Sequence, residues 1–169
     1  VVQHDKGNYH AALENYNKAL KADKDNLTAL SEMAGTYLSM GEKEKCIETC
    51  RKAIKKHPKD ENLAFVYVAY GNALDGMGKT DEALKIYDNG IELFPTYYHL
   101  HFNKGVSLAG KSELQEALAC FERAVIEKAD HSSSHHAIGK LQDINKNRIP
   151  AVLAYCRFLV IEPEGIRFA

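Results

Sequence analysis

The sequence has no excess of either charge and no long apolar run. Its 169 residues include 22 Lys and Arg against 23 Asp and Glu, a formal net charge of −1. A surface for nucleic acid or anionic lipid usually shows a basic excess, so this balance argues against both. The longest apolar stretch, 63–70, has eight residues, whereas a membrane-spanning helix needs about 20. We therefore expect no nucleic-acid partner and no insertion into a membrane.

Motifs for metal, phosphate or nucleophilic chemistry are also lacking. The four cysteines form no Cys-x-x-Cys pair and no Cys/His zinc spacing. Cys46 and Cys50 are one helical turn apart, where a disulfide has poor geometry, so we expect two small core residues. No glycine loop of the phosphate-binding kind is present. We expect no catalytic residue, metal or cofactor, and no enzyme activity. The cysteines are compatible with a reducing compartment, which slightly favours the cytoplasm without assigning a location.

What the sequence does contain is a repeat with a period of about 34 residues. Gly71, Gly105 and Gly139 are evenly spaced at this period. Each is followed at a constant distance by an alanine and, four positions later, by an aromatic residue; these are Ala83 and Tyr87, Ala117 and Phe121, and Ala151 and Tyr155. A domain with one central core has no reason to show this spacing, whereas stacked helix pairs need the same close contacts in every pair. The repeat therefore predicts an all-α fold of about nine helices in stacked antiparallel pairs.

Turn residues divide these helices. Gly41 and Gly78 are expected to end two first helices, while Thr80, Ser112 and the serines of 132–134 are expected to cap the helices that follow. Three extra residues, 61–63, are expected to add a turn to a first helix over about 62–77. Because Val1 falls inside a repeat, we expect a fragment of a longer protein. The predicted organisation is a single solenoid over 1–169, with a partial repeat over about 1–26, complete repeats over 27–60, 61–97, 98–131 and 132–165, and a truncated continuation over 166–169.

The pattern resembles the tetratricopeptide repeat family over essentially the whole chain. That family has a small residue in the first helix, alanine and then an aromatic residue in the second, and proline at the exit. The matching positions are Gly71, Leu74, Ala83, Tyr87 and Pro95 in one repeat, Ala34, Tyr37, Ala53 and Pro58 in the repeat before it, and Gly105, Leu108, Ala117, Phe121 and Ala124 in the repeat after it. The resemblance implies a right-handed α–α superhelix, a solenoid of helix pairs.

Histidines are the main departure from that pattern. His101 and His135 stand where the family has a large residue, and one full period separates them. His131 and His135 are four apart, a spacing that can bind a metal on a helix. The equivalence of His101 and His135 in the repeat favours half-buried packing residues over a metal site.

The resemblance also implies that the first helix of each pair lines a concave groove that binds a peptide. The middle of that face is apolar for an exposed surface, and exposed apolar patches mark binding sites. Asparagine amides there can hydrogen-bond a peptide backbone. Lys140 is the main basic residue, so the lysine- and arginine-rich clamp of members that bind acidic chaperone tails is not expected. The predicted peptide-binding residues are Phe65, Val68, Asn72, His99, Phe102, Asn103, Val106, His136 and Lys140.

Three functions remain open from the sequence. The first is a non-catalytic interaction module or scaffold whose groove binds a peptide or protein segment. The second is a structural spacer or self-associating scaffold within a larger protein. The third is the recruiting arm of an enzyme whose catalytic part lies outside this sequence. The histidines also predict that binding depends on pH near neutrality.

Overall fold

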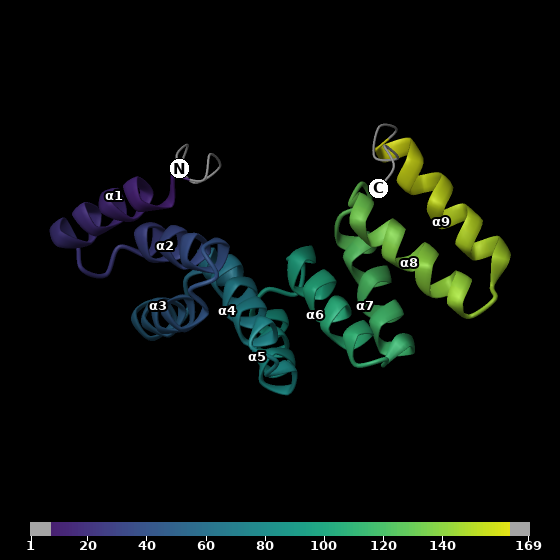
Figure 1. Cartoon of the computed structure of the whole chain (residues 1–169), viewed down its shortest axis with the longest axis horizontal. Helices are drawn as coiled ribbons and strands as arrows, with labels where there is room; N and C mark the ends of the chain where they lie inside the picture. Colours follow the sequence, from purple (N-terminus) through teal and green to yellow (C-terminus); the bar gives the residue numbers. More distant parts are fainter. Residues whose placement is uncertain (1–7, 163–169) are drawn as a thin grey trace. The chain divides into compact units, whose positions relative to one another are not determined.

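The computed structural model describes residues 8–162, and within them the secondary structure is nine α-helices and one short 3-10 turn (Figure 1). The elements in chain order are α1 (Tyr9–Ala22), α2 (Leu27–Ser39), α3 (Lys43–Lys56), the 3-10 turn η2 (Glu61–Leu63), α4 (Ala64–Gly76), α5 (Thr80–Leu93), α6 (Tyr98–Gly110), α7 (Leu114–Glu127), α8 (Ser132–Ile144) and α9 (Arg148–Ile161). No strand occurs in this range.

The helices associate in consecutive pairs, α2 with α3, α4 with α5, α6 with α7, and α8 with α9. Pairs also stack on one another, because α1 packs on α2, α3 on α4 and α7 on α8. The chain divides into two compact units, one up to Phe94 and one from Pro95, and each is described by itself. The fold is thus the predicted all-α stack of helix pairs. The division into numbered repeats stays a prediction, and its ends, 1–7 and 163–169, lie outside the described residues.

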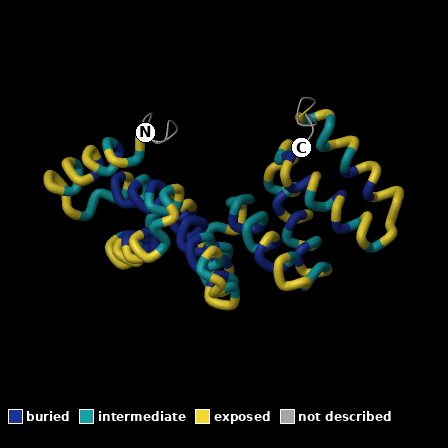
Figure 2. Tube along the Cα trace, viewed as in Figure 1, coloured by how far each residue is buried: buried dark blue, intermediate teal, exposed yellow. Residues whose placement is uncertain are grey.

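Small and aromatic residues of the repeat form the core of each pair, and buried residues follow the helix contacts (Figure 2). Ala117 and Phe121 of α7 are 0% and 2% exposed. A Cβ atom built on Gly105 of α6 would lie 2.7 Å from Cε1 of Phe121, so only glycine fits there without movement. Cys46 and Cys50 are fully buried with their Sγ atoms 4.0 Å apart, which confirms them as core residues.

The four first helices α2, α4, α6 and α8 end in the same turn. In α2, the N–H of Gly41 donates to the carbonyl of Leu38, and the N–H of Glu42 donates to that of Tyr37. This pair of bonds is a Schellman motif, which needs a residue with positive φ after the helix. The residues with positive φ are Gly41 at 76°, Gly78 at 76°, Ser112 at 65° and Lys146 at 59°.

This turn corrects the predicted N-caps. Ser112 occupies the left-handed position of the turn, and Glu113 precedes α7 as its N-cap residue. Thr80 is the first residue of α5, and its hydroxyl donates to Asp75 Oδ1 over 2.7 Å. The serines of 132–134 lie inside α8, where His131 is at the N-cap. These predictions were wrong because they treated capping residue type as sufficient and did not consider the backbone geometry of the preceding turn.

The three extra residues of the third pair form η2 rather than a regular first turn of α4. The side chain of Asp60 accepts a hydrogen bond from the N–H of Asn62, at 2.9 Å, and so caps this turn. Leu63 at its end is fully buried. The predicted first helix over about 62–77 is therefore shorter, and its regular part begins at Ala64.

Candidate peptide-binding site

In the first unit, the three predicted binding residues of α4 differ in accessibility. Phe65 is 42% exposed, and its ring lies against the backbone of Gly35 on α2, where a Cβ atom would be 3.0 Å from Cζ. Val68 is buried in the core, at 7% exposed. Asn72 is half-buried, and its Oδ1 accepts a hydrogen bond from the hydroxyl of Tyr87 over 2.7 Å. Of the three, Phe65 is the one with side-chain surface open to a ligand.

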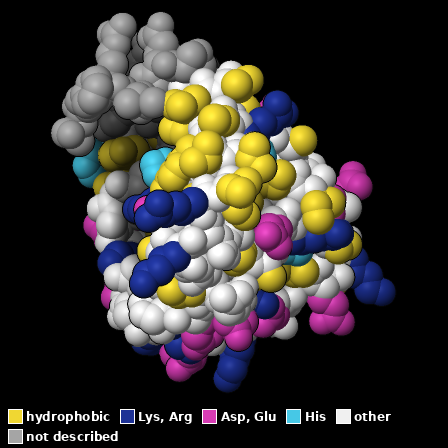
Figure 3. All heavy atoms as spheres, turned by 90° about the vertical axis from the view of Figure 1, so that its right-hand side faces the viewer, with side chains coloured by type: hydrophobic (Ala, Val, Ile, Leu, Met, Phe, Trp, Pro, Cys, Tyr) yellow, Lys and Arg dark blue, Asp and Glu magenta, His cyan; other side chains and the backbone are white. Residues whose placement is uncertain are grey.

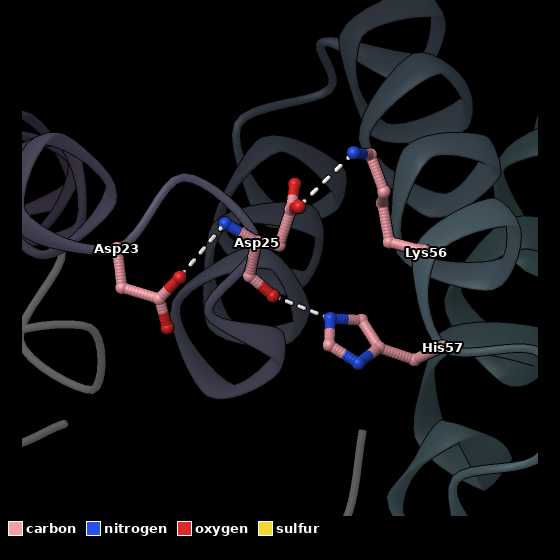
Figure 4. A network of polar contacts seen from close by, with 4 residues as sticks. All are labelled: Asp23, Asp25, Lys56 and His57. Carbon is pink, nitrogen blue, oxygen red and sulfur yellow. Dashed lines mark hydrogen bonds and ion pairs between the residues drawn. The ribbon is translucent and has the colours of Figure 1, made fainter.

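A polar pocket of about 360 Å³ lies at the start of α2, in the same unit. Its acidic groups are engaged locally: the N–H of Asp25 donates to Asp23 Oδ1 at 3.1 Å, and Lys56 Nζ lies 3.0 Å from Asp25 Oδ2 (Figure 4). The Lys56 hydrogen bond lowers the pKa of the Asp25 carboxyl below its usual value. His57 contacts the carbonyl of Asp25 through Nε2. This network ties the end of α3 to the link between α1 and α2, and we assign it a structural role.

In the second unit, five aromatic rings gather where α6 and α8 begin, and one of them, Tyr97, has its ring centroid 5.5 Å from that of His99. Phe102 and Tyr98 of α6 have ring centroids 4.9 Å and 4.8 Å from that of His131. His99 lies 5.9 Å from His131 in the same cluster. Burial is the main cause that lowers the pKa of both histidines, so the neutral rings are favoured. The predicted residues His99 and Phe102 are thus brought together, and sequence reasoning missed Tyr98 and His131 as their partners.

Asn103 of α6 is turned to its own helix. Its Nδ2 donates to the carbonyl of His99 over 2.7 Å, and the side chain is half-buried. His136 of α8 is exposed but lies beside α9, with ring centroids 6.0 Å from Tyr155 and 4.9 Å from Phe158. Both residues therefore have intramolecular contacts that a ligand would have to share or replace.

His101 and His135 have the same environment in consecutive pairs. His101 is 7% exposed and His135 is 9% exposed. Each Nε2 bonds to the backbone carbonyl six positions before it in the chain, that of Pro95 at 2.8 Å and that of Ala129 at 2.9 Å. Because Pro95 and Ala129 are also separated by one full period, the bond is part of the repeat. The structure confirms both histidines as packing residues.

The remaining predicted residues, Val106 and Lys140, meet at an apolar pocket of about 280 Å³ within the second unit. Val106 is 46% exposed and Ile144 is 60% exposed at its border. The lining is Val106, Ala109, Leu114, Phe121, Ala137, Lys140, Leu141 and Ile144. The pocket has the composition of a small binding site, with mostly apolar walls and one polar group at the edge.

Sequence reasoning found two residues of this pocket and missed others. Ile144 follows Lys140 by one helical turn, so its exposed apolar side chain was a signal that helical spacing could have detected. Leu114 comes from α7, a second helix, and nothing in the spacing of first-helix residues pointed to it. The pocket combines three helices, whereas the prediction used one helix face at a time.

Chemistry other than binding has little support in the described part of the chain. Residues 8–162 contain no group of three or more His, Cys, Asp or Glu side chains placed to hold a metal ion. Among the helices of this range, none has the length and apolarity to cross a bilayer. The arrangement in the second unit can accept an apolar side chain beside a lysine, which is a binding function.

Comparison with known proteins identifies the repeat. Two sequence profiles described as tetratricopeptide repeat match residues 3–69 and 69–132. The chain belongs to the tetratricopeptide repeat family. Members of this family bind protein partners, so the tetratricopeptide repeats assign the chain to protein-interaction scaffolds in the broad sense.

A relative by sequence is the photosystem I assembly protein Ycf3 of a Prochlorococcus marinus strain, with 31% identity over 122 residues, which are 64% of this chain and 70% of that protein. The chain spans about half, 55%, of the length of proteins of the same name from two Synechococcus strains. Their assembly role belongs to those proteins.

Two solved structures show the same fold. TTC0263, a tetratricopeptide repeat protein of Thermus thermophilus, is 23% identical with a TM-score of 0.80, and the match covers 98% of this chain and 89% of that one. YrrB, described as a tetratricopeptide repeat protein with an unusual peptide-binding site, is 21% identical with a TM-score of 0.67, over 98% of this chain and 84% of that one. At these identities the likeness concerns the fold alone.

Proposed function

We propose that this protein is a non-catalytic interaction module that binds a peptide or protein segment at the apolar pocket of its second unit. The observation that carries the proposal is the position of Val106 and Lys140 at one pocket between α6, α7 and α8. Its walls suit an aliphatic side chain of the partner, and the lysine suits a neighbouring carboxylate or carbonyl.

The other predicted residues have supporting roles in this proposal. His99, Phe102 and Asn103 shape the start of α6 through contacts within the protein, and Phe65 offers a separate apolar contact in the first unit. Val68 and Asn72 are held in the packing of α4. A ligand that enters the pocket therefore depends first on Val106 and Lys140.

The test is a pull-down from a lysate of the source organism, with mass spectrometry of the captured proteins. The variant is Val106→Lys with Lys140→Glu, which puts a charge on the apolar wall and reverses the one at the rim. The matched control is Ile126→Lys with Lys55→Glu, because Ile126 is 70% exposed and Lys55 is exposed, and neither lines the pocket. Circular dichroism verifies that both variants are folded.

Partners that the wild type and the control capture, and the pocket variant loses, support the proposal. Equal capture by all three proteins contradicts the pocket as the binding site. Capture of nothing by the wild type favours the spacer, which needs no ligand.

An assembly role is the physiological setting that fits best. The Ycf3 relatives are named for assembly of photosystem I, and a module that holds a protein segment without reacting with it suits the assembly of a complex. Because the chain spans about half the length of several of these relatives, we propose the role of holding a subunit and do not assign the complex.

A further inference from the structure

The last helix, α9, exposes an apolar stripe that the stack does not use. Ile149, Leu153 and Val160 are 77%, 66% and 72% exposed, and Cys156 between them is also exposed. These four residues are the second, sixth, ninth and thirteenth of the helix, so they lie on one side of it. Figure 3 looks onto the side of the molecule where α9 lies and shows hydrophobic side chains gathered there, with both basic and acidic side chains at their border.

The same positions in two other second helices, α3 and α5, are polar. In α3, which also has 14 residues, they are Glu44, Glu48, Arg51 and Lys55, all exposed. In α5 they are Asp81, Lys85, Asp88 and Glu92, again all exposed. These two helices therefore present a polar stripe to water, whereas α9 presents an apolar one.

A further helix pair stacked on α9 would not bury the stripe. The internal comparison is α7, which has α6 on one side and α8 on the other. Its residues at these positions, Gln115, Ala119, Glu122 and Ile126, remain exposed despite both neighbours. An extension of the stack would leave Ile149, Leu153 and Val160 equally exposed, so it does not explain why they are apolar.

The spacing of the stripe describes the helix that would cover it. Steps of four, three and four residues are those of a two-helix seam, in which each apolar residue packs between residues of the facing helix. Val152, which is 57% exposed, lies beside this seam and widens the apolar surface on one side.

The charges beside the stripe describe the partner further. Within 148–161 the charged residues are Arg148 and Arg157, both exposed, and the acidic residue whose charge interacts with Arg157 is Asp130, before α8. Glu162, the residue after this segment, accepts a hydrogen bond from Ser132 of α8. A second copy of α9 would bring arginines against arginines, whereas a helix with acidic flanks would pair with them.

We infer that the exposed stripe of α9 is a docking surface for an amphipathic helix of another protein, apolar along one seam and acidic beside it. This surface is separate from the pocket at Val106 and Lys140, because none of the stripe residues lines that pocket. The protein then has two binding surfaces in its second unit, one for a peptide side chain and one for a helix.

The test uses two fluorescent synthetic helices with the same leucine and isoleucine seam, one flanked by glutamates and the other by lysines. Fluorescence anisotropy measures their affinity for the full chain. The glutamate helix is expected to bind at least tenfold more tightly, and Arg157→Glu is expected to reverse the preference. Leu153→Lys is expected to lower the affinity for the glutamate helix about 100-fold, because the substitution removes a leucine contact that binding would bury and adds a charge to the seam.

Ile126→Lys is the matched control, since it changes an exposed aliphatic residue of α7, at the position equivalent to Val160, and should leave the affinity unchanged. No binding of either helix, equal binding of both, or unchanged binding by Leu153→Lys overturns the inference. Two further measurements complete the test. A dimer seen by sedimentation of the wild type and lost in Leu153→Lys would assign the stripe to a second copy instead. Cosedimentation with anionic vesicles that is lost in Leu153→Lys would assign it to a membrane. If Leu153→Lys fails to fold, the Arg157→Glu reversal decides.

Discussion

The ring of Phe121 in α7 packs against the backbone of α6 at Gly105, where glycine has no side chain to separate them. The ring of Phe121 is 2% exposed and also lies against Phe102, with centroids 5.6 Å apart. A Cβ atom on Gly105 would approach Cε1 of Phe121 to 2.7 Å, so the ring or the helices would have to shift. This contact is repeated at Gly139 and Tyr155 in the next pair, where the same Cβ would lie 2.5 Å from Cε1.

We therefore predict that Gly105→Ala destabilises the protein by about 1–3 kcal/mol through overpacking. Urea denaturation followed by circular dichroism measures the change. Gly110→Ala on the same helix is the control, because a Cβ there meets nothing within 4 Å. That control should be neutral or stabilising by up to about 1 kcal/mol, since alanine is the better helix former. Equal effects of the two substitutions would show that the contact with Phe121 is unimportant.

A second prediction concerns the turns after α6 and α8. Ser112 and Lys146 have φ of 65° and 59° at the place where the first two pairs have Gly41 and Gly78. A residue with a Cβ atom loses about 1–2 kcal/mol in the left-handed region, and part of this is offset by the greater freedom of glycine in the unfolded chain. Ser112→Gly and Lys146→Gly should each raise the stability by about 0.5–1 kcal/mol in the same assay.

The reverse substitution provides the control for these turns. Gly78→Ala has open space around the new Cβ, yet it should lower the stability because its φ is 76°. Loss of stability in Ser112→Gly, or none in Gly78→Ala, would contradict the account of the turn.

These two features show what sequence reasoning could and could not reach. The contact of Gly105 with Phe121 follows from a spacing that recurs, so the sequence alone predicts it. Ser112 was predicted to be an N-cap because serine is favoured at that position. Its left-handed backbone conformation could be inferred only by aligning it with Gly78 of the preceding repeat. The burial of Val68 was also missed, because helical spacing tells which side of a helix a residue is on but not how closely the next helix approaches.

A third prediction concerns the bond between His101 and the carbonyl of Pro95. His101→Leu keeps a large side chain but leaves that carbonyl without its 2.8 Å partner. A hydrogen bond of this kind contributes a net of about 0.5–1.5 kcal/mol, and the variant should be less stable by this amount, because the bond is partly buried and Pro95 is exposed. His10→Leu, at an exposed position of α1, is expected to change the stability little. A His101→Leu variant as stable as the wild type would show that water or movement satisfies the carbonyl.

The fourth prediction is a loss of stability in mild acid that depends on His99. Burial lowers the pKa of His99 and His131 below the usual 6.5, and the charge of Lys128 acts in the same direction on both. His135 also disfavours a charge on His131, and Asp130 opposes this in part. The unfolded chain therefore takes up protons at a higher pH than the folded one. The contribution to stability is complete above about pH 6.5 and is lost as the pH falls through the lowered folded pKa.

His99→Phe removes one of the two groups and keeps a ring in the cluster with Tyr98 and His131. The melting temperature of the wild type should fall more than that of His99→Phe between about pH 7.5 and about pH 5.5, by on the order of 2 °C for a half-buried group in a protein of this size. Because the change of melting temperature with pH is measured for each protein separately, the effect of the substitution itself on stability cancels. Parallel slopes would mean that His99 takes up its proton in the folded protein as it does in the unfolded chain, and would contradict the prediction.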